Sequence, residues 1–146
     1  MRVDFYHLTR VPLDRALPQI ADRVLASGAR LLIVSASDEQ CAALDAQLWN
    51  GSPESFLAHG RAGGDADADQ PILIAPDVNA ANGARNIALV DGEWREDALD
   101  FDRTFHFFDE SAISAARAAW KALGEHDGVE RHYWKQNEAG RWEQAA

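Results

Sequence analysis

The chain has 146 residues, 47% hydrophobic and 26% charged, which is ordinary for one globular domain. Its 24 acidic residues outnumber its 14 lysines and arginines, and the net charge of −10 argues against a protein that grips nucleic acid directly. No apolar run approaches the ~20 residues that span a bilayer, the amino terminus has no secretory pattern, and the single Cys41 excludes an internal disulfide. These features favour a cytoplasmic protein.

The first half of the chain alternates between strand and helix patterns. A β-branched and aromatic run predicts a strand at 3–8, and a fully apolar run predicts a second strand at 30–35. Between them, apolar spacing predicts a helix that begins near Pro12 and ends at Gly28, with Pro18 tolerable only in the first turn.

A second helix is predicted to begin at a capping box and to end at a tryptophan. In that box the Ser37 hydroxyl accepts from the Gln40 N–H while the Gln40 side chain reaches back, and the helix continues to Trp49. Cys41 falls on the inward face of this helix, where a free cysteine behaves as a small hydrophobe.

The second half predicts a polar loop, three more strands and another helix. The loop is at 60–70, the strands are at 72–75, 86–90 and 104–108, and the helix starts at Asp109 or Ser111 and ends near Gly124. Residues 132–146 are interpreted as an extended arm or hairpin. The whole chain, 1–146, is therefore predicted to form one three-layer α/β domain of nucleotide-binding type, with a mostly parallel sheet and helices on both faces.

The sequence offers no good candidate for catalysis, a metal or a cofactor. The glycines at 60–64 lack the Lys-Ser/Thr pair of a phosphate-binding loop, and the early strand-to-helix junctions contain no glycine. Asp65, Asp67 and Asp69 mimic half of a calcium loop but lack its glycine and its final glutamate. The five histidines show no ligand spacing, and His106 is expected to be half-buried in a strand. We therefore predict a protein without a nucleotide site, a metal, a cofactor or catalytic residues.

The last helix carries an unusual combination of side chains. Arg117 and Lys121 stand one turn apart beside Trp120, among small alanines. Two cations beside an indole suit an acidic peptide with an aromatic anchor. The alternative is that Trp120 belongs to an ordinary core stripe, and the residue pattern alone favours that alternative.

Several segments resemble the chi subunit of bacterial DNA polymerase III, an accessory subunit of the clamp loader. They are VDFYHL, RLLIVSASDEQCAALDAQLW, LWNGSPESFLAHG, AARAAWKAL and YWKQNEAGRWE, of which the Trp-Pro-Glu-Ser-Phe-His block is the most distinctive. The resemblance implies a non-enzymatic adaptor in DNA replication. It would bind the psi subunit on one side and the acidic, Phe-ending tail of single-stranded-DNA-binding protein on the other.

Matched position by position, the resemblance assigns two separate surfaces. Arg117, Trp120 and Lys121 fall on the tail-binding helix, while Trp49 and Phe56 fall on the psi-facing surface. Some relatives carry a lysine one turn before the arginine, where this chain has Ile113. The alternative from a different class is a divergent α/β nucleotide hydrolase or nuclease, which ATP and magnesium would stabilise against heat.

Overall fold

The computed structural model describes residues 1–49 and 58–146, and its centre is one eight-stranded sheet in the order β3-β4-β2-β5-β6-β1-β7-β8. Every neighbouring pair is parallel except β7 and β8, which are antiparallel. The strands are β1 Arg2–His7, β2 Leu31–Val34, β3 His59–Arg61, β4 Ile72–Ala75, β5 Asn86–Leu89, β6 Arg103–Phe108, β7 Glu130–Gln136 and β8 Trp142–Gln144. The predicted α/β class with a mostly parallel sheet is confirmed.

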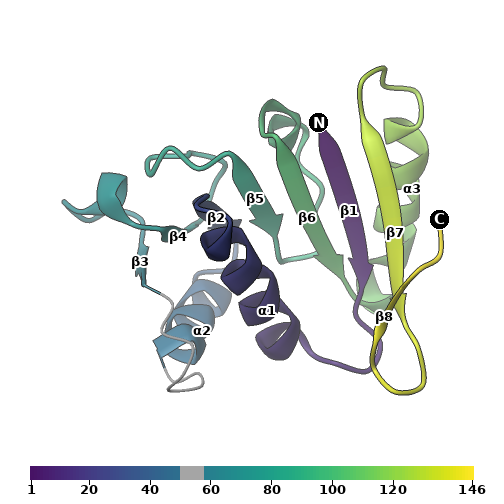
Figure 1. Ribbon diagram of the computed structural model, residues 1–146, viewed down its shortest axis with the longest axis horizontal. Helices are drawn as coiled ribbons and strands as arrows, with labels where there is room; N and C mark the ends of the chain where they lie inside the picture. The colour runs from purple at the N-terminus through teal and green to yellow at the C-terminus, as the bar shows by residue number, and fades with distance from the viewer. Residues whose placement is uncertain (50–57) are drawn as a thin grey trace.

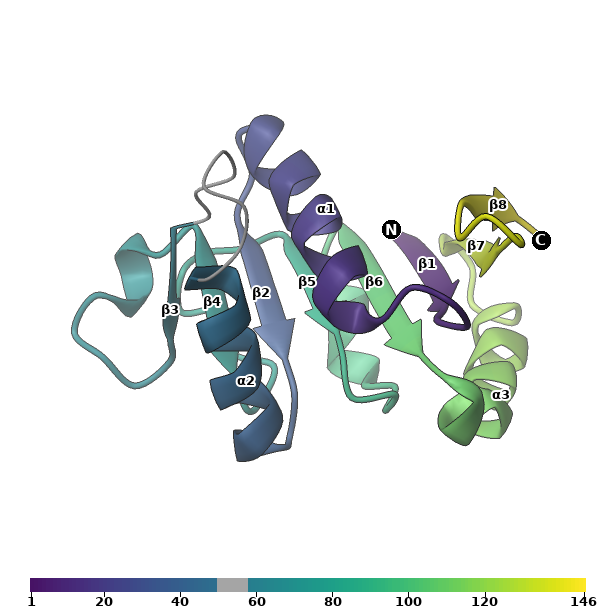
Figure 2. The ribbon, with the colours of Figure 1, turned by 90° about the horizontal axis from the view of Figure 1, so that it is seen from below.

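Helices cover both faces of this sheet. Figure 1 shows α1 (Leu13–Ala26) and α2 (Asp38–Trp49) in front of the sheet and α3 (Ile113–Leu123) behind β7. Figure 2, seen from below, shows the strands crossing the molecule from β3 to the β7–β8 pair. The described residues also contain three short 3-10 helices: η1 Asp67–Asp69, η2 Glu96–Asp100 and η3 Glu110–Ala112. None of the helices in the described residues is long and apolar enough to cross a membrane.

The apolar run of β2 lies at the centre of the sheet. Each of its four residues is buried, because α1 and α2 cover one face and the loops around η2 cover the other. A strand that is covered on both faces has apolar residues at every position, which explains why the sequence predicted this strand correctly.

Pro18 does not lie in the first turn of its helix, so that expectation is wrong. It is the sixth residue of α1, which runs unbroken to Ala26. A proline there has no N–H to donate to the carbonyl four residues earlier. The helix continues because its inner face is packed in the core, through Ala16, Leu17, Ile20, Ala21 and Val24. This packing offsets the lost hydrogen bond.

The segment predicted as a loop at 60–70 contains two elements that the sequence did not signal. Residues His59–Arg61 form the edge strand β3, parallel to β4, and η1 lies further along the same segment. Three residues with the sequence HGR carry little β propensity. Their strand conformation comes from backbone pairing with β4.

The capping box at the start of α2 forms only in part. The Gln40 N–H donates to the Ser37 hydroxyl at 3.1 Å, as predicted. The Gln40 side chain does not reach back to Ser37; its amide donates to the carbonyl of Val90 at 3.0 Å and its oxygen accepts from the Ser35 hydroxyl. The side chain thus joins α2 to the end of β5. Cys41 is buried as expected, and burial raises the pKa of its thiol.

His106 is fully buried, not half-buried as the sequence suggested. Its ring lies edge-on to Phe5 and Trp94, with centroids 5.2 and 5.6 Å away, and neither ring nitrogen has a hydrogen-bond partner among the described residues. Burial in this aromatic environment lowers the pKa of His106 to about 4. The imidazole is therefore neutral at neutral pH and behaves as a core side chain.

Asp4 is a buried carboxylate that joins three strands. It is fully buried within β1 and accepts hydrogen bonds from Arg2 at 3.0 Å, from Arg103 of β6 at 2.9 Å and from the Trp134 indole of β7 at 3.0 Å. A buried charge is tolerated only when it is paired and hydrogen-bonded. The three donors meet that requirement and fix β6 and β7 against β1.

We expect Asp4→Ala to lower the free energy of unfolding by about 3 kcal/mol, because it leaves the Trp134 indole N–H without an acceptor and removes the carboxylate partner of two arginines. The loss should lie at the low end for a buried ion pair because both arginine side chains reach solvent. Urea denaturation measures it. Asp14→Ala, at an exposed position of α1, is the control, and equal stability of the two variants would contradict the role of Asp4.

His106 should make stability fall in acid. Because its folded pKa of about 4 lies below the unfolded value of 6.5, the unfolded chain binds the proton first as the pH falls. The contribution of the neutral, buried His106 to the free energy of unfolding is complete above pH 6.5. It is lost as the pH falls toward 4, which lowers the free energy of unfolding by about 3 kcal/mol. Urea denaturation across this range should give a smaller pH slope for His106→Leu than for the wild type. Identical slopes would show that His106 does not titrate in this way.

Candidate binding surfaces

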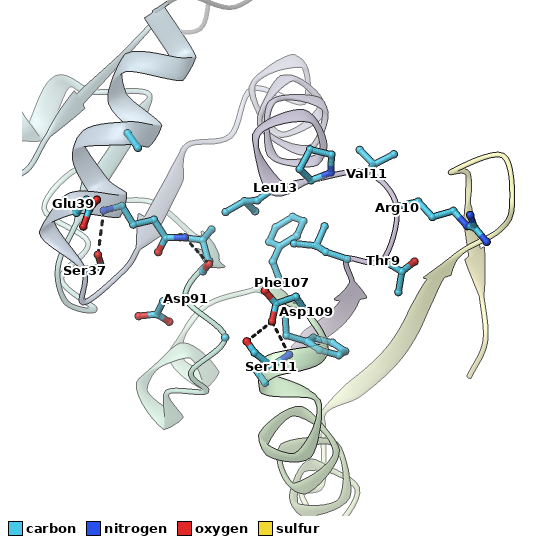
Figure 3. A pocket seen from close by; sticks show the side chains of 18 residues that line it. Thr9, Arg10, Val11, Leu13, Ser37, Glu39, Asp91, Phe107, Asp109 and Ser111 are labelled. Carbon is cyan, nitrogen blue, oxygen red and sulfur yellow. Dashed lines mark hydrogen bonds between the residues drawn. The ribbon is translucent and has the colours of Figure 1, made fainter.

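A crevice of about 810 Å³ opens at the carboxyl ends of β1, β2, β5 and β6 (Figure 3). The chain leaves β1 for α1 on one face of the sheet and leaves neighbouring β6 for α3 on the other face. In open α/β sheets such a divergence is where ligands usually bind. The crevice is therefore the place to test for a nucleotide site.

The side chains that line the crevice do not fit a polyphosphate. They include the carboxylates of Glu39, Asp91 and Asp109, with Arg10 as the one cation of the lining. The Asp109 carboxylate accepts from the backbone N–H of Ser111 at the start of η3, as predicted for one of the two candidate caps. A phosphate site needs a glycine-rich strand-to-helix turn with free N–H donors. The crevice is lined by Gly92 after β5, but at the turn after β1 the N–H groups of Thr9, Arg10 and Val11 already donate to the Gln136 side-chain oxygen.

Asp91 illustrates how the polar groups of the crevice serve the fold. Its carboxylate accepts from Arg95 at 2.7 Å and from the backbone N–H groups of Ala36 and Glu93 at 2.9 and 3.1 Å. Burial acts to raise the pKa of Asp91, but these hydrogen bonds outweigh it and hold the pKa below its usual value. Across the described residues, no three His, Cys, Asp or Glu side chains gather as a possible metal site.

The α3 surface brings Arg117, Trp120 and Lys121 together, as the helical spacing predicted. Arg117 and Lys121 are exposed, whereas Trp120 is half-buried. The indole lies edge-on to Phe5 and Tyr133, with centroids 5.4 and 5.7 Å away. Trp120 thus packs with Ala116 and Leu123 in the apolar cluster under α3, as the core interpretation expected, and part of its surface stays exposed.

Strand β7 adds residues to the α3 surface that the sequence did not point to. The Arg131 guanidinium lies 4.3 Å from the centroid of the Trp120 ring, and Lys135 lies 5.8 Å from that of Tyr133. The Tyr133 ring is stacked with the Phe5 ring and lies edge-to-face with the Trp120 ring. These contacts depend on the β1–β7 pairing, for which the sequence gave no signal beyond the alternation of the tail.

The α3 surface is basic in an otherwise acidic protein. Arg117, Lys121, Arg131 and Lys135 form no ion pair with a carboxylate within residues 1–49 and 58–146. Partial burial raises the pKa of Tyr133; the positive charge of Arg117 acts to lower it and the negative charge of Glu110 to raise it. Unpaired cations around aromatic rings can bind an anionic partner that also has an aromatic group.

The second predicted surface lies at the end of α2. Trp49 is the last residue of that helix and is 54% exposed, with its ring 4.4 Å from the ring of His59. The other residue predicted for this surface, Phe56, lies outside the described residues. Trp49 and the α3 surface belong to helices on opposite faces of the sheet, so Trp49 lies apart from Arg117, Trp120 and Lys121.

Aromatic and basic side chains exposed together on an open α/β sheet are typical of a surface that binds another molecule. The sequence model of the family described as "DNA polymerase III chi subunit, HolC" matches residues 1–130. The chain belongs to this family, and its role is that of an accessory subunit of DNA polymerase III in replication. A search of curated proteins finds no match.

Among solved structures, the chain is similar to the C-terminal domain of Saccharomyces cerevisiae Dbp5, in a structure with Gle1 and IP6. The TM-score is 0.56, the identity is 13%, and the match covers 88% of each chain. At this identity the likeness concerns the fold alone. Nearly all of β7 and all of β8 lie beyond the residues that the family match covers.

Proposed function

We propose that this chain is a non-enzymatic adaptor of the clamp loader of DNA polymerase III. It joins the psi subunit to the acidic, Phe-ending C-terminal tail of single-stranded-DNA-binding protein, and it meets DNA only through these partners. It acts in the cytoplasm and has no catalytic activity of its own. The observation that carries the proposal is the basic and aromatic α3 surface on a protein of net charge −10.

The α3 surface supports the tail-binding half of the proposal. Arg117 and Lys121 are exposed at one edge of Trp120, where they can meet aspartates and the terminal carboxylate of a tail. The half-buried Trp120 and Tyr133 rings offer an apolar contact for a terminal phenylalanine. The net charge of −10 disfavours binding of an acidic peptide elsewhere on the protein, which adds specificity to the attraction.

The end of α2 supports the psi-binding half. Trp49 exposes more than half of its surface, although its own helix buries Cys41, Leu44 and Leu48. Exposed tryptophans are enriched among the residues that dominate protein–protein interfaces. Phe56, which the family resemblance pairs with Trp49, completes the proposed psi contact.

The tail-binding half predicts that a peptide with several aspartates and a terminal phenylalanine binds the wild-type chain. Affinity should fall as salt rises, because the contacts are between charges. Arg117→Glu should weaken binding by more than tenfold, which corresponds to about 1.4 kcal/mol or more. Fluorescence anisotropy of a labelled peptide measures the affinity.

Arg15→Glu provides a matched control for this experiment, because it makes the same charge change at an exposed position of α1, on the other face of the sheet. It should keep nearly wild-type affinity. Failure of the wild-type chain to bind the peptide at low salt would contradict tail binding.

The psi-binding half predicts that Trp49→Ala weakens the complex with psi by roughly 30-fold, since loss of a central interface tryptophan costs about 2 kcal/mol or more. Copurification and calorimetric titration with psi measure the effect, and thermal unfolding checks that the variant is folded. Gln47→Ala, an exposed position two residues earlier in α2, should leave the complex intact. A folded Trp49→Ala, Phe56→Ala variant that binds psi fully would disprove this interface.

A further inference from the structure

Arg131 has an unusual position for an arginine near the carboxyl terminus of a helix. It comes from β7, its guanidinium carbon lies 4.3 Å from the centroid of the Trp120 ring, and its Nη1 donates to the Trp120 carbonyl. The guanidinium therefore contacts Trp120 in two ways: it lies over the indole ring, and it donates a hydrogen bond to the backbone carbonyl. It also places a positive charge at the carboxyl end of α3, where the helix dipole favours one.

Gly124 makes room for this arrangement. A Cβ atom at this position would lie 2.9 Å from the guanidinium carbon of Arg131. The backbone of Gly124 has an ordinary right-handed conformation, with φ of −63°, so the residue is not required there for backbone geometry. The space that its missing side chain leaves is occupied by the Arg131 guanidinium.

The hydrogen-bonding capacity of Arg131 is only partly used. A guanidinium has five N–H donors, and one of them is engaged by the Trp120 carbonyl. No carboxylate of the described residues pairs with it, and the side chain is half-buried and held in place. An arginine that is already ordered loses less entropy when it binds a carboxylate.

We propose that Arg131 is a further cation of the tail-binding surface and that it also positions Trp120 there. This inference rests on the proposed function, because it concerns the same surface. Arg131 binds a carboxylate of the acidic tail with its remaining donors, while its stacked guanidinium fixes the indole beside the terminal phenylalanine. The site then consists of α3 and β7 together.

The test measures binding of the same acidic, Phe-ending peptide to the full chain at several salt concentrations. Arg131→Met should weaken binding roughly tenfold and should reduce the slope of log affinity against log salt, because one charge contact is lost. Arg131→Lys keeps the charge but lacks the planar fork, so roughly a threefold loss is expected. Arg141→Met, which removes an exposed arginine at the β7–β8 turn, should change affinity by less than twofold.

Gly124→Ala gives an independent arm because it displaces the Arg131 guanidinium without changing any charge. Its affinity should fall toward that of Arg131→Met, with little change in thermal stability.

If Arg131→Met binds like the wild type while Arg117→Glu does not, the inference about Arg131 is wrong and the proposed function stands. A loss of affinity with an unchanged salt slope and a lower unfolding temperature would reduce Arg131 to a structural role. Absence of binding by the wild-type chain would instead refute tail binding itself.

Discussion

The buried carboxylate of Asp4 is the interaction on which the carboxyl-terminal half of the sheet depends. It needs several donors to be stable without water, and these come from β1 itself, from β6 and from β7. Because the Trp134 indole must reach Asp4, β7 is held beside β1 in one register. The need of the buried Asp4 carboxylate for donors thus helps to position β7, a strand that lies almost entirely beyond the residues covered by the family match.

The alternation of side chains along β7 carries this constraint through the sheet to the opposite face. Trp134 points to Asp4, so its neighbour Tyr133 and the residue two before that, Arg131, lie on the face that α3 covers. A one-residue slip of β7 would exchange the two sets of side chains. The basic and aromatic α3 surface is therefore a consequence of the same register that satisfies Asp4.

Trp120 links the stability of the molecule to its proposed binding role. Its edge contacts with Phe5 and Tyr133 anchor the ring in the apolar cluster under α3, which also contains Ala116 and Leu123. The Arg131 guanidinium lies over its ring and forms no ion pair with a carboxylate of the described residues. An anchored ring is already ordered before a partner arrives, so less of the binding free energy is spent on fixing it.

Local sequence patterns were enough to predict the class of fold and the residues that α3 carries. The apolar run of β2 predicted a strand covered on both faces, and helical spacing alone brought Arg117, Trp120 and Lys121 together, because both signals are local. Tertiary structure decided the continuation of α1 through Pro18, the strand conformation of His59–Arg61, the complete burial of His106 and the approach of Arg131 to Trp120. Each of these depends on a neighbour that is distant in sequence, and the hydrogen bonds and packing that impose it leave no periodic pattern in the chain.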